Sequence, residues 1–214
     1  MPREDNQILG RSHVNDIDSI ASTNADPDEV LHAVKDQADA LFTWNYSKGE
    51  RPRLDKLYEK AKTSQWNGQT DLDWSIEVDP IKSFSVFDGG NSSMTSHCRD
   101  NPESPAYLFE EKHWEEFSLE SLAWRISQFM HGEQGALLCT AKIVETVPWI
   151  DAKYYAATQV VDEARHVEVF SRYLQDKVGI TYPVNPHLQL LLDDIINDSR
   201  WDMTYLGMQI MVEG

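Results

Sequence analysis

The stretch that decides the fold covers residues 151–178 and reads DAKYYAATQVVDEARHVEVFSRYLQDKV. Its apolar side chains recur at intervals of three and four residues, which is the spacing of one face of an α-helix. Six side chains form this apolar stripe: Tyr155, Ala156, Val160, Val167, Phe170 and Leu174. Asp151 can cap the start of the helix and Gly179 can end it. The pattern predicts one amphipathic helix over residues 151–178.

Two ionisable side chains, Glu163 and His166, fall inside that apolar stripe. Burying an ionised carboxylate without a partner costs several kcal/mol, so we expect a partner in the core. The spacing of three residues places a carboxylate oxygen and an imidazole nitrogen on one side of the helix, where both can bind one metal ion. The sequence therefore predicts a metal site on this helix.

Two further segments have long apolar stripes. A helix is expected over residues 118–147, because Ser118 can cap its start and Pro148 ends it. Another is expected to begin at Asn185-Pro186 and to reach the C-terminus. Long helices joined by short links predict an antiparallel bundle.

The two flanking helices also direct carboxylates toward the core. Glu133 interrupts the stripe of the first, and Glu213 occupies the next stripe position of the last. Oxygen and imidazole ligands without thiolate suit iron or manganese. We therefore expect Glu133, Glu163, His166 and Glu213 to be metal ligands.

Four neighbouring residues admit two interpretations each. Asp162 lies four residues before His166 and three before Arg165, so Asp162 and Arg165 either orient the histidine from behind or form a surface ion pair. Tyr155 and Gln159 lie on the ligand side of the helix, where they line a substrate or oxygen pocket or simply pack in the core.

The chain divides into three parts by composition. Residues 1–26 are polar and patternless, and are predicted to be a mobile tail. Residues 27–105 are expected to form an irregular, partly helical extension that packs on the bundle. Residues 106–214 are expected to form the bundle itself.

Within the extension, helices are expected over residues 26–42 and 52–66. Residues 67–105 are predicted to be irregular, because glycine, proline and asparagine interrupt them repeatedly. Three tryptophans of the extension are expected to pack against a larger body: Trp44, Trp66 and Trp74.

Composition excludes several classes of protein. The formal charge of the 214-residue chain is −17, which disfavours binding to nucleic acid. No apolar run reaches the length of about 18 residues that a membrane span needs, and no signal peptide is recognisable. The two cysteines, Cys98 and Cys139, are too few for a disulfide framework. A cytoplasmic protein is expected.

Three segments, HGEQGAL (131–137), DEARH (162–166) and MVEG (211–214), resemble the ferritin-like di-iron carboxylate superfamily. They look most like its oxygen-activating branch, which includes ribonucleotide reductase small subunits, bacterial multicomponent monooxygenases and amine N-oxygenase-like proteins. The resemblance covers about residues 115–214 and implies an all-α fold with a ferritin-like antiparallel helical bundle.

Members of that branch carry six ligands in the order Glu, Glu-x-x-His, Glu, Glu-x-x-His. By matching positions, Glu133 is the first, Glu163 and His166 are the first pair, and Glu213 is the ligand of the next helix. The last pair has no counterpart, so the resemblance implies a bundle that is incomplete at the C-terminus. Either the sequence is truncated, or a homodimer completes one centre from two sets of ligands.

The resemblance implies a non-haem di-iron oxidoreductase that activates dioxygen to oxidise a small organic substrate. Two iron ions are the expected cofactors, with a manganese–iron pair as the alternative, and an electron-transfer protein is an expected partner. Two other functions remain open: a ferritin-like protein that binds and oxidises iron, and a bundle that has lost its metal.

Overall fold

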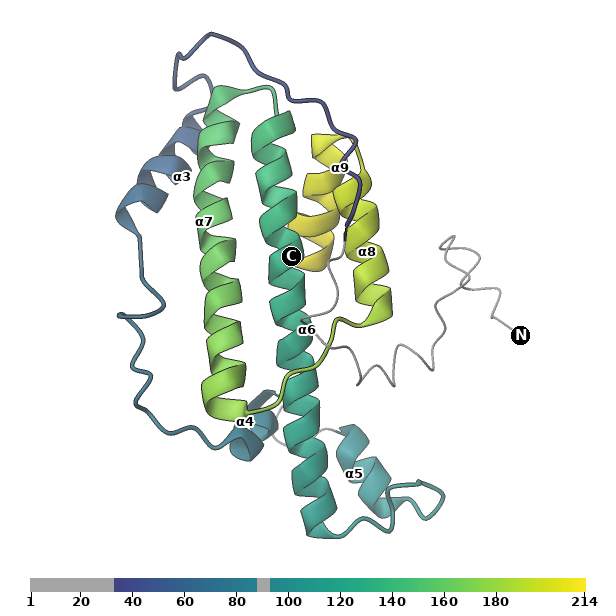
Figure 1. Ribbon diagram of the computed structural model, residues 1–214. Coiled ribbons are helices and arrows are strands. Elements are labelled where there is room, and N and C mark those ends of the chain that lie inside the picture. The colour runs from purple at the N-terminus through teal and green to yellow at the C-terminus, as the bar shows by residue number, and fades with distance from the viewer. Residues whose placement is uncertain (1–32, 88–92) are drawn as a thin grey trace, which may run out of the picture.

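The computed structural model describes residues 33–87 and 93–214 (Figure 1). Every regular element in these residues is a helix, which confirms the all-α prediction. The predicted tail over residues 1–26 lies outside the described residues.

Two long antiparallel helices form the centre of the molecule, α6 (Glu111–Thr146) and α7 (Ile150–Tyr173). They stand side by side in Figure 1 and contact each other along most of their length. A turn over residues 147–149 joins them, and a π-helical turn, η1 (Leu174–Val178), extends α7 to Gly179. The predicted antiparallel pair is therefore confirmed.

Helix α6 begins seven residues before the predicted cap. Its N-terminus is closed by Glu110 and His113, because the Glu110 carboxylate accepts the His113 N–H while His113 Nδ1 accepts the Glu110 N–H at 3.0 Å. Ser118 instead donates its hydroxyl to the carbonyl oxygen of Trp114 at 2.7 Å, inside the helix.

The C-terminal segment forms three helical elements with one break, after the first of them, whereas the sequence predicted one long helix. These are α8 (Pro186–Asn197), α9 (Trp201–Tyr205) and the π-helix η2 (Leu206–Val212). The predicted cap is confirmed, since the Asn185 side chain accepts the N–H groups of the first turn of α8.

Polar contacts stabilise the break between α8 and α9. The Asp198 carboxylate accepts the N–H of Arg200 at 2.9 Å, which closes a local turn. The buried Lys142 ammonium donates to the carbonyl oxygen of Ile196, which lies in the last turn of α8. These contacts satisfy groups that a continuous helix would pair internally.

The extension departs from its prediction at the start. Residues 33–50 contain no helix. The prediction of a helix over residues 26–42 is therefore wrong for residues 33–42, the part that the structure describes. This segment crosses the end of the α6–α7 pair (Figure 1), where the N–H of Leu41 donates to the carbonyl oxygen of Glu145 at 3.0 Å. A tertiary hydrogen bond has replaced the local helical ones.

Three short helices follow in the extension. Helix α3 (Pro52–Thr63) confirms the second predicted helix and lies against α7. The segment over residues 67–105 was predicted to be irregular, yet it contains α4 (Pro80–Phe87) and α5 (Ser93–Asp100). Helix α4 contacts α6, and such contact stabilises a helix too short to form alone.

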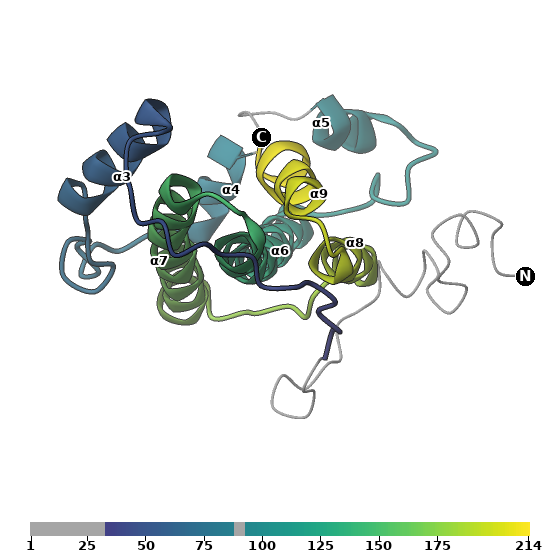
Figure 2. The same ribbon diagram turned by 90° about the horizontal axis from the view of Figure 1, so that it is seen from above.

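The core is arranged around α6, which lies between α7 on one side and α8 and α9 on the other (Figure 2). Glycines allow the closest approaches. A Cβ at Gly135 would lie 2.5 Å from the side chain of Leu192, and one at Gly207 would lie 2.9 Å from Ile195. The largest apolar cluster joins α6, α8 and η2: Ala136, Cys139, Leu192, Ile195 and Met208.

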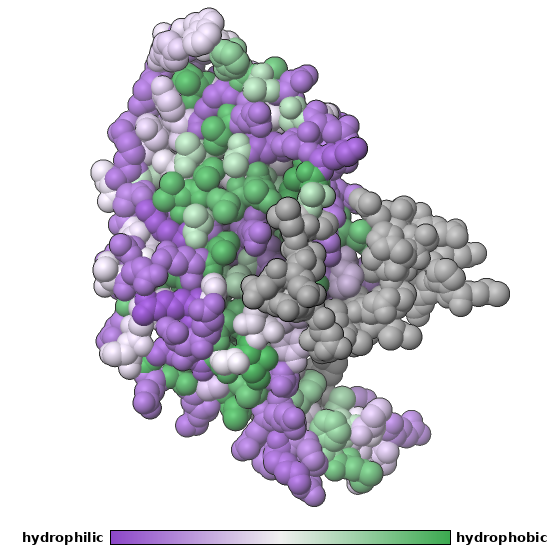
Figure 3. Space-filling model, in the orientation of Figure 1, coloured by the Kyte–Doolittle hydropathy of each residue, from purple (hydrophilic) through white to green (hydrophobic). Residues whose placement is uncertain are grey.

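Apolar side chains also reach the surface of the central pair. Figure 3 shows hydrophobic residues gathered over the middle of the visible face, with hydrophilic residues around them. Phe129 and Leu138 on α6 and Val161 on α7 are among the exposed apolar residues. No helix within residues 33–87 and 93–214 has the length and apolarity needed to cross a membrane.

Candidate metal centre

Glu133 on α6 and Glu163 and His166 on α7 come together between the two central helices. One ligand atom from each lies within 4.8 Å of the others. His166 Nδ1 lies 3.1 Å from Glu133 Oε2 and 3.0 Å from Glu163 Oε2. The sequence predicted that these three side chains would meet, and the structure brings them to one point, where they could hold a metal ion.

The three ligand groups differ in their exposure to solvent. Glu163 is only 6% exposed, as its position in the apolar stripe predicts. The His166 side chain is 42% exposed and that of Glu133 is 24% exposed. The site therefore has one buried carboxylate and an outer side that solvent can reach.

The electrostatics of the site favour a cation. Burial and the nearby charge of Glu213 raise the pKa of Glu163 to about 7, and Glu133 adds to the effect. Burial would lower the pKa of His166, but the carboxylates of Glu133 and Glu163 outweigh burial and raise it. A single imidazolium faces several carboxylates, so a divalent cation would relieve the remaining repulsion. The donor set, oxygen and imidazole nitrogen, fits iron or manganese.

Glu213 lies at the edge of this group. It follows the last turn of η2, is exposed, and is not one of the three residues whose ligand atoms lie within 4.8 Å. It is nevertheless close enough for its charge to raise the pKa of Glu163. Partial desolvation and the charge of Glu133 raise the pKa of Glu213 itself.

A side-chain hydrogen bond connects α7 to η2. Gln159 Nε2 donates to Gln209 Oε1 at 3.1 Å, across a separation of 50 residues. The same offset relates Glu163 to Glu213. The predicted pocket residue Gln159 is thus hydrogen-bonded to a residue that the sequence interpretation did not single out. The signal was present, since Gln209 precedes Glu213 by one helical turn.

Further polar side chains lie one to two helical turns from the ligand candidates along the same helical segments. Thr140 is two helical turns from Glu133 on the same side of α6 and is fully buried. Among the described residues, its hydroxyl has no hydrogen-bond partner, and neither has the buried Nε2 of Gln209. Tyr155 is half-buried, and burial raises its pKa. Unpaired polar atoms of this kind are unusual in a protein core.

Asp162 and Arg165 form the ion pair that the sequence left as one of two alternatives. Arg165 Nη1 lies 2.7 Å from Asp162 Oδ1, and its other nitrogen donates to Gln65. The Arg165 guanidinium also lies 5.6 Å from the centre of the Trp66 ring. Trp66, which the sequence interpretation did not connect to the site, has its ring centre 6.4 Å from that of His166.

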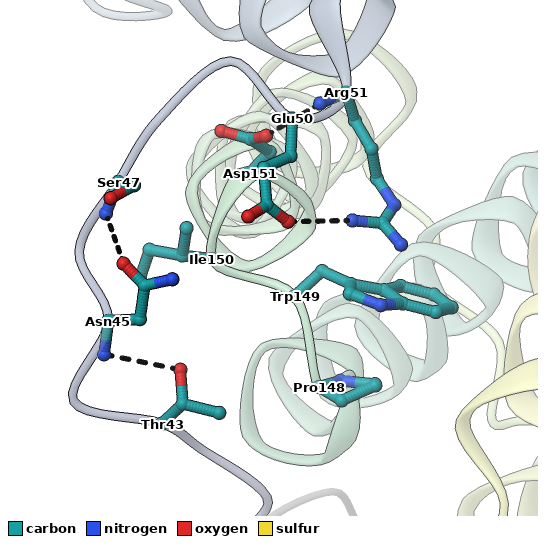
Figure 4. Close-up of a pocket in the computed structure, with 9 residues that line it drawn as sticks. All are labelled: Thr43, Asn45, Ser47, Glu50, Arg51, Pro148, Trp149, Ile150 and Asp151. Atoms are coloured by element: carbon teal, nitrogen blue, oxygen red, sulfur yellow. Dashed lines mark hydrogen bonds and ion pairs between the residues drawn. The ribbon is translucent and has the colours of Figure 1, made fainter.

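A small cavity of about 210 Å³ lies at the N-terminal end of α7 (Figure 4). Asp151, predicted to cap α7, instead accepts the N–H groups of Gly49 at 3.1 Å and Arg51 at 3.0 Å. The Arg51 guanidinium lies 4.0 Å from the centre of the Trp149 ring. Asp151 precedes Glu163 by twelve residues, or about 18 Å along the helix, so this cavity is separate from the candidate metal centre.

Comparison of the chain with protein-family models, curated proteins and solved structures gives no significant match.

Proposed function

We propose that the chain is an oxygen-activating protein of the ferritin-like di-iron carboxylate class, which oxidises a small organic substrate. The observation that carries the proposal is the convergence of Glu133, Glu163 and His166 within 4.8 Å between two antiparallel helices. The resemblance of the DEARH segment over residues 162–166 supports the choice of iron. A manganese–iron pair would use the same oxygen and nitrogen ligands.

The side chains have distinct tasks in this proposal. Glu163 and His166 supply an oxygen and a nitrogen ligand from one helix, and Glu133 supplies an oxygen from the other. Glu213 approaches from the last helical segment as a further ligand. When bound, reduced iron supplies electrons to dioxygen. An electron-transfer protein would restore those electrons between turnovers.

Proton handling follows from the raised pKa values. Without metal, Glu163 holds a proton near neutral pH because its pKa is about 7. Metal binding requires the deprotonated ligand, so it displaces this proton. The low exposure of Glu163 keeps water away from the inner side of the centre, which protects a reactive site from side reactions.

A second candidate function is iron handling, in which the centre oxidises iron and passes it on. The observation that favours it is the 42% exposure of the His166 side chain, which leaves an ion a route to the ligands. The mass of the assembly in solution distinguishes the two, because iron storage needs a large closed shell.

The test of both functions begins with metal binding. The full chain is titrated anaerobically with Fe(II) by calorimetry, and bound iron is counted by elemental analysis. We expect Glu163→Ala and His166→Ala to weaken Fe(II) binding by about 100-fold or more while circular dichroism stays unchanged. The matched control is Glu115→Ala, which removes an exposed carboxylate from α6 and should bind as the wild type does.

Oxygen chemistry is tested next. The Fe(II)-loaded protein should consume dioxygen, and Glu163→Ala should not. A wild-type chain that binds neither Fe(II) nor Mn(II) would overturn the proposal, and so would a Glu163→Ala variant that binds as tightly as the wild type.

A further inference from the structure

A segment of the extension lies along the outer side of α7, and we call residues 64–77 the outer strap. Gln69 fastens its middle, since Gln69 Nε2 donates to Glu168 Oε1 at 2.6 Å and Gln69 Oε1 accepts from Arg172 Nη1 at 2.7 Å. At the far end, Lys177 Nζ donates to the carbonyl oxygen of Trp74 at 2.6 Å. At the near end, Arg165 donates to Gln65. The outer strap is thus attached to successive turns of α7 and to η1.

Gly68 allows the outer strap to sit directly on the helix. Gly68 is buried, and a Cβ at this position would lie 2.8 Å from Val169 Cγ2. Its carbonyl oxygen also accepts the indole N–H of Trp74 at 2.6 Å. Val169 is β-branched and stiff in a helix, so it cannot easily yield to an added methyl group. Any side chain at Gly68 must therefore lift the outer strap away from α7.

The near end of the outer strap places Trp66 beside the candidate metal centre. The ring centres of Trp66 and His166 are 6.4 Å apart with an interplanar angle of 30°, a distance at which aromatic rings attract each other. The Arg165 guanidinium also contacts the indole, at 5.6 Å from the Trp66 ring centre. Arg165 is itself held in place by its ion pair with Asp162.

We propose that Trp66 is a positioning residue, through which the outer strap fixes the ring of His166 with Nδ1 directed at Glu133 and Glu163. This inference rests on the proposed metal centre. Metal-binding histidines are commonly oriented by a second contact, and loss of that contact weakens metal binding. Here the contact is aromatic packing from a segment that lies about 100 residues earlier in the chain.

Metal affinity tests the inference with Fe(II) alone as the probe. We expect Trp66→Ala to weaken anaerobic Fe(II) binding by about tenfold, and Trp66→Phe to recover most of the loss because it restores an aromatic ring. If the Trp66→Ala variant binds Fe(II) as tightly as the wild type, the inference is overturned while the proposed function stays intact.

A pair of glycines provides a test that leaves every ring in place. Gly68→Ala should weaken Fe(II) binding, because its methyl group meets Val169. Gly132→Ala is the matched control, since nothing lies within 4 Å of a Cβ at that position although it adjoins Glu133. The double variant Gly68→Ala with Val169→Ala should bind as the single Val169→Ala variant does. A Gly68→Ala variant with wild-type affinity would contradict the role of the outer strap.

A spectroscopic measurement on the metal-free protein separates this inference from the proposed function. The indole ring current should shift the ring-proton resonances of His166, which are assigned by their loss in His166→Gln. We expect Trp66→Ala and Gly68→Ala to move these resonances, and Gly132→Ala to leave them in place. Unchanged resonances in the first two variants would overturn the inference, even if the wild type bound no metal. Circular dichroism confirms that each variant is folded.

Discussion

Glu133 and His166 meet across the interface between α6 and α7, with Oε2 of the first 3.1 Å from Nδ1 of the second. The two residues are 33 positions apart and belong to antiparallel helices, so the contact depends on the register of that pair. Two apolar clusters that join α6 to α7 and η1, one on each side of this level, hold the register. The candidate centre therefore rests on the most extensively packed part of the molecule.

The metal-free protein should lose stability as the pH rises through neutrality. The pKa of Glu163 is about 7 in the folded chain against 4.5 for the ordinary group, so the folded state binds this proton more tightly. The resulting stabilisation is fully present below pH 4.5 and is lost as the pH rises through 7. We expect the contribution of Glu163 to the free energy of unfolding to fall by about 3 kcal/mol between pH 5 and pH 8. The raised pKa of His166 acts in the same direction, with its contribution lost above pH 6.5.

Urea unfolding with chelator present, at a series of pH values, measures this change. Glu163→Gln carries no titrating group and should flatten the difference between pH 5 and pH 8. If Glu163→Gln and the wild type show the same pH dependence, the carboxyl of Glu163 does not have a raised pKa.

In the metal-free protein, Glu213 should act on Glu163 through its charge. Its carboxylate is the largest cause, after burial, of the raised pKa of Glu163. We expect Glu213→Gln to lower the pKa of Glu163 toward its ordinary value of 4.5, as followed by NMR of the side-chain carboxyl carbon. The exposed carboxylate of Glu115 provides the control, because Glu115→Gln should leave the titration of Glu163 unchanged.

Thr140→Val should stabilise the protein. A buried hydroxyl without a partner loses its hydrogen bonds to water and gains none, and a methyl group in its place removes that cost. We expect the free energy of unfolding to rise by about 1 kcal/mol. Thr146 on the same helix is the control, since it is also buried but its hydroxyl donates to the carbonyl oxygen of Lys142 at 2.8 Å. Thr146→Val should therefore lower the free energy of unfolding by about 1 kcal/mol. Equal losses in both variants would mean that the Thr140 hydroxyl has a partner.

The three central ligand candidates could be predicted because each interrupts an apolar stripe of a regular helix. Glu133, Glu163 and His166 occupy positions at which the 3.6-residue period points to the core, and α6 and α7 keep that period throughout. The identity of a metal could not follow from periodicity, because oxygen and nitrogen donors suit several ions.

The last helical segment shows where periodicity fails. In one continuous α-helix from Asn185-Pro186, Leu206 and Ile210 continue the apolar stripe that begins at Leu188 and Leu192, yet both are exposed, while Met208 is fully buried. These residues belong to the π-helix η2, whose wider turn rotates each following side chain away from its α-helical position.

The sequence also does not predict which side chains of the extension contact the bundle. Trp44 was expected to pack against a larger body, but it is 78% exposed. Trp66 and Trp74 do contact the bundle, through Arg165 and Arg172. Neither composition nor spacing distinguishes these three tryptophans, because the difference lies in tertiary contacts with α7 that Trp66 and Trp74 make through arginines.

Asp151→Ala should destabilise the junction between the extension and the bundle. The Asp151 side chain is 2% exposed and binds the backbone N–H groups of Gly49 and Arg51, as the close-up in Figure 4 shows for Arg51. Removing the carboxylate leaves two donors unpaired, and hydrogen bonds to a charged acceptor contribute more than neutral ones. We expect the free energy of unfolding to fall by about 3 kcal/mol, measured by urea unfolding at pH 7.

Asp73→Ala is the matched control for this prediction, since Asp73 is exposed and its carboxylate accepts hydrogen bonds from the nearby Ser75. Its loss should cost about 1 kcal/mol or less. Because Asp151 lies about 18 Å along the helix from Glu163, Asp151→Ala should keep its Fe(II) affinity wherever it remains folded. If Asp151→Ala lowers the free energy of unfolding by no more than Asp73→Ala does, the Gly49 and Arg51 N–H groups find other acceptors. Asp151 would then not fix the extension to α7.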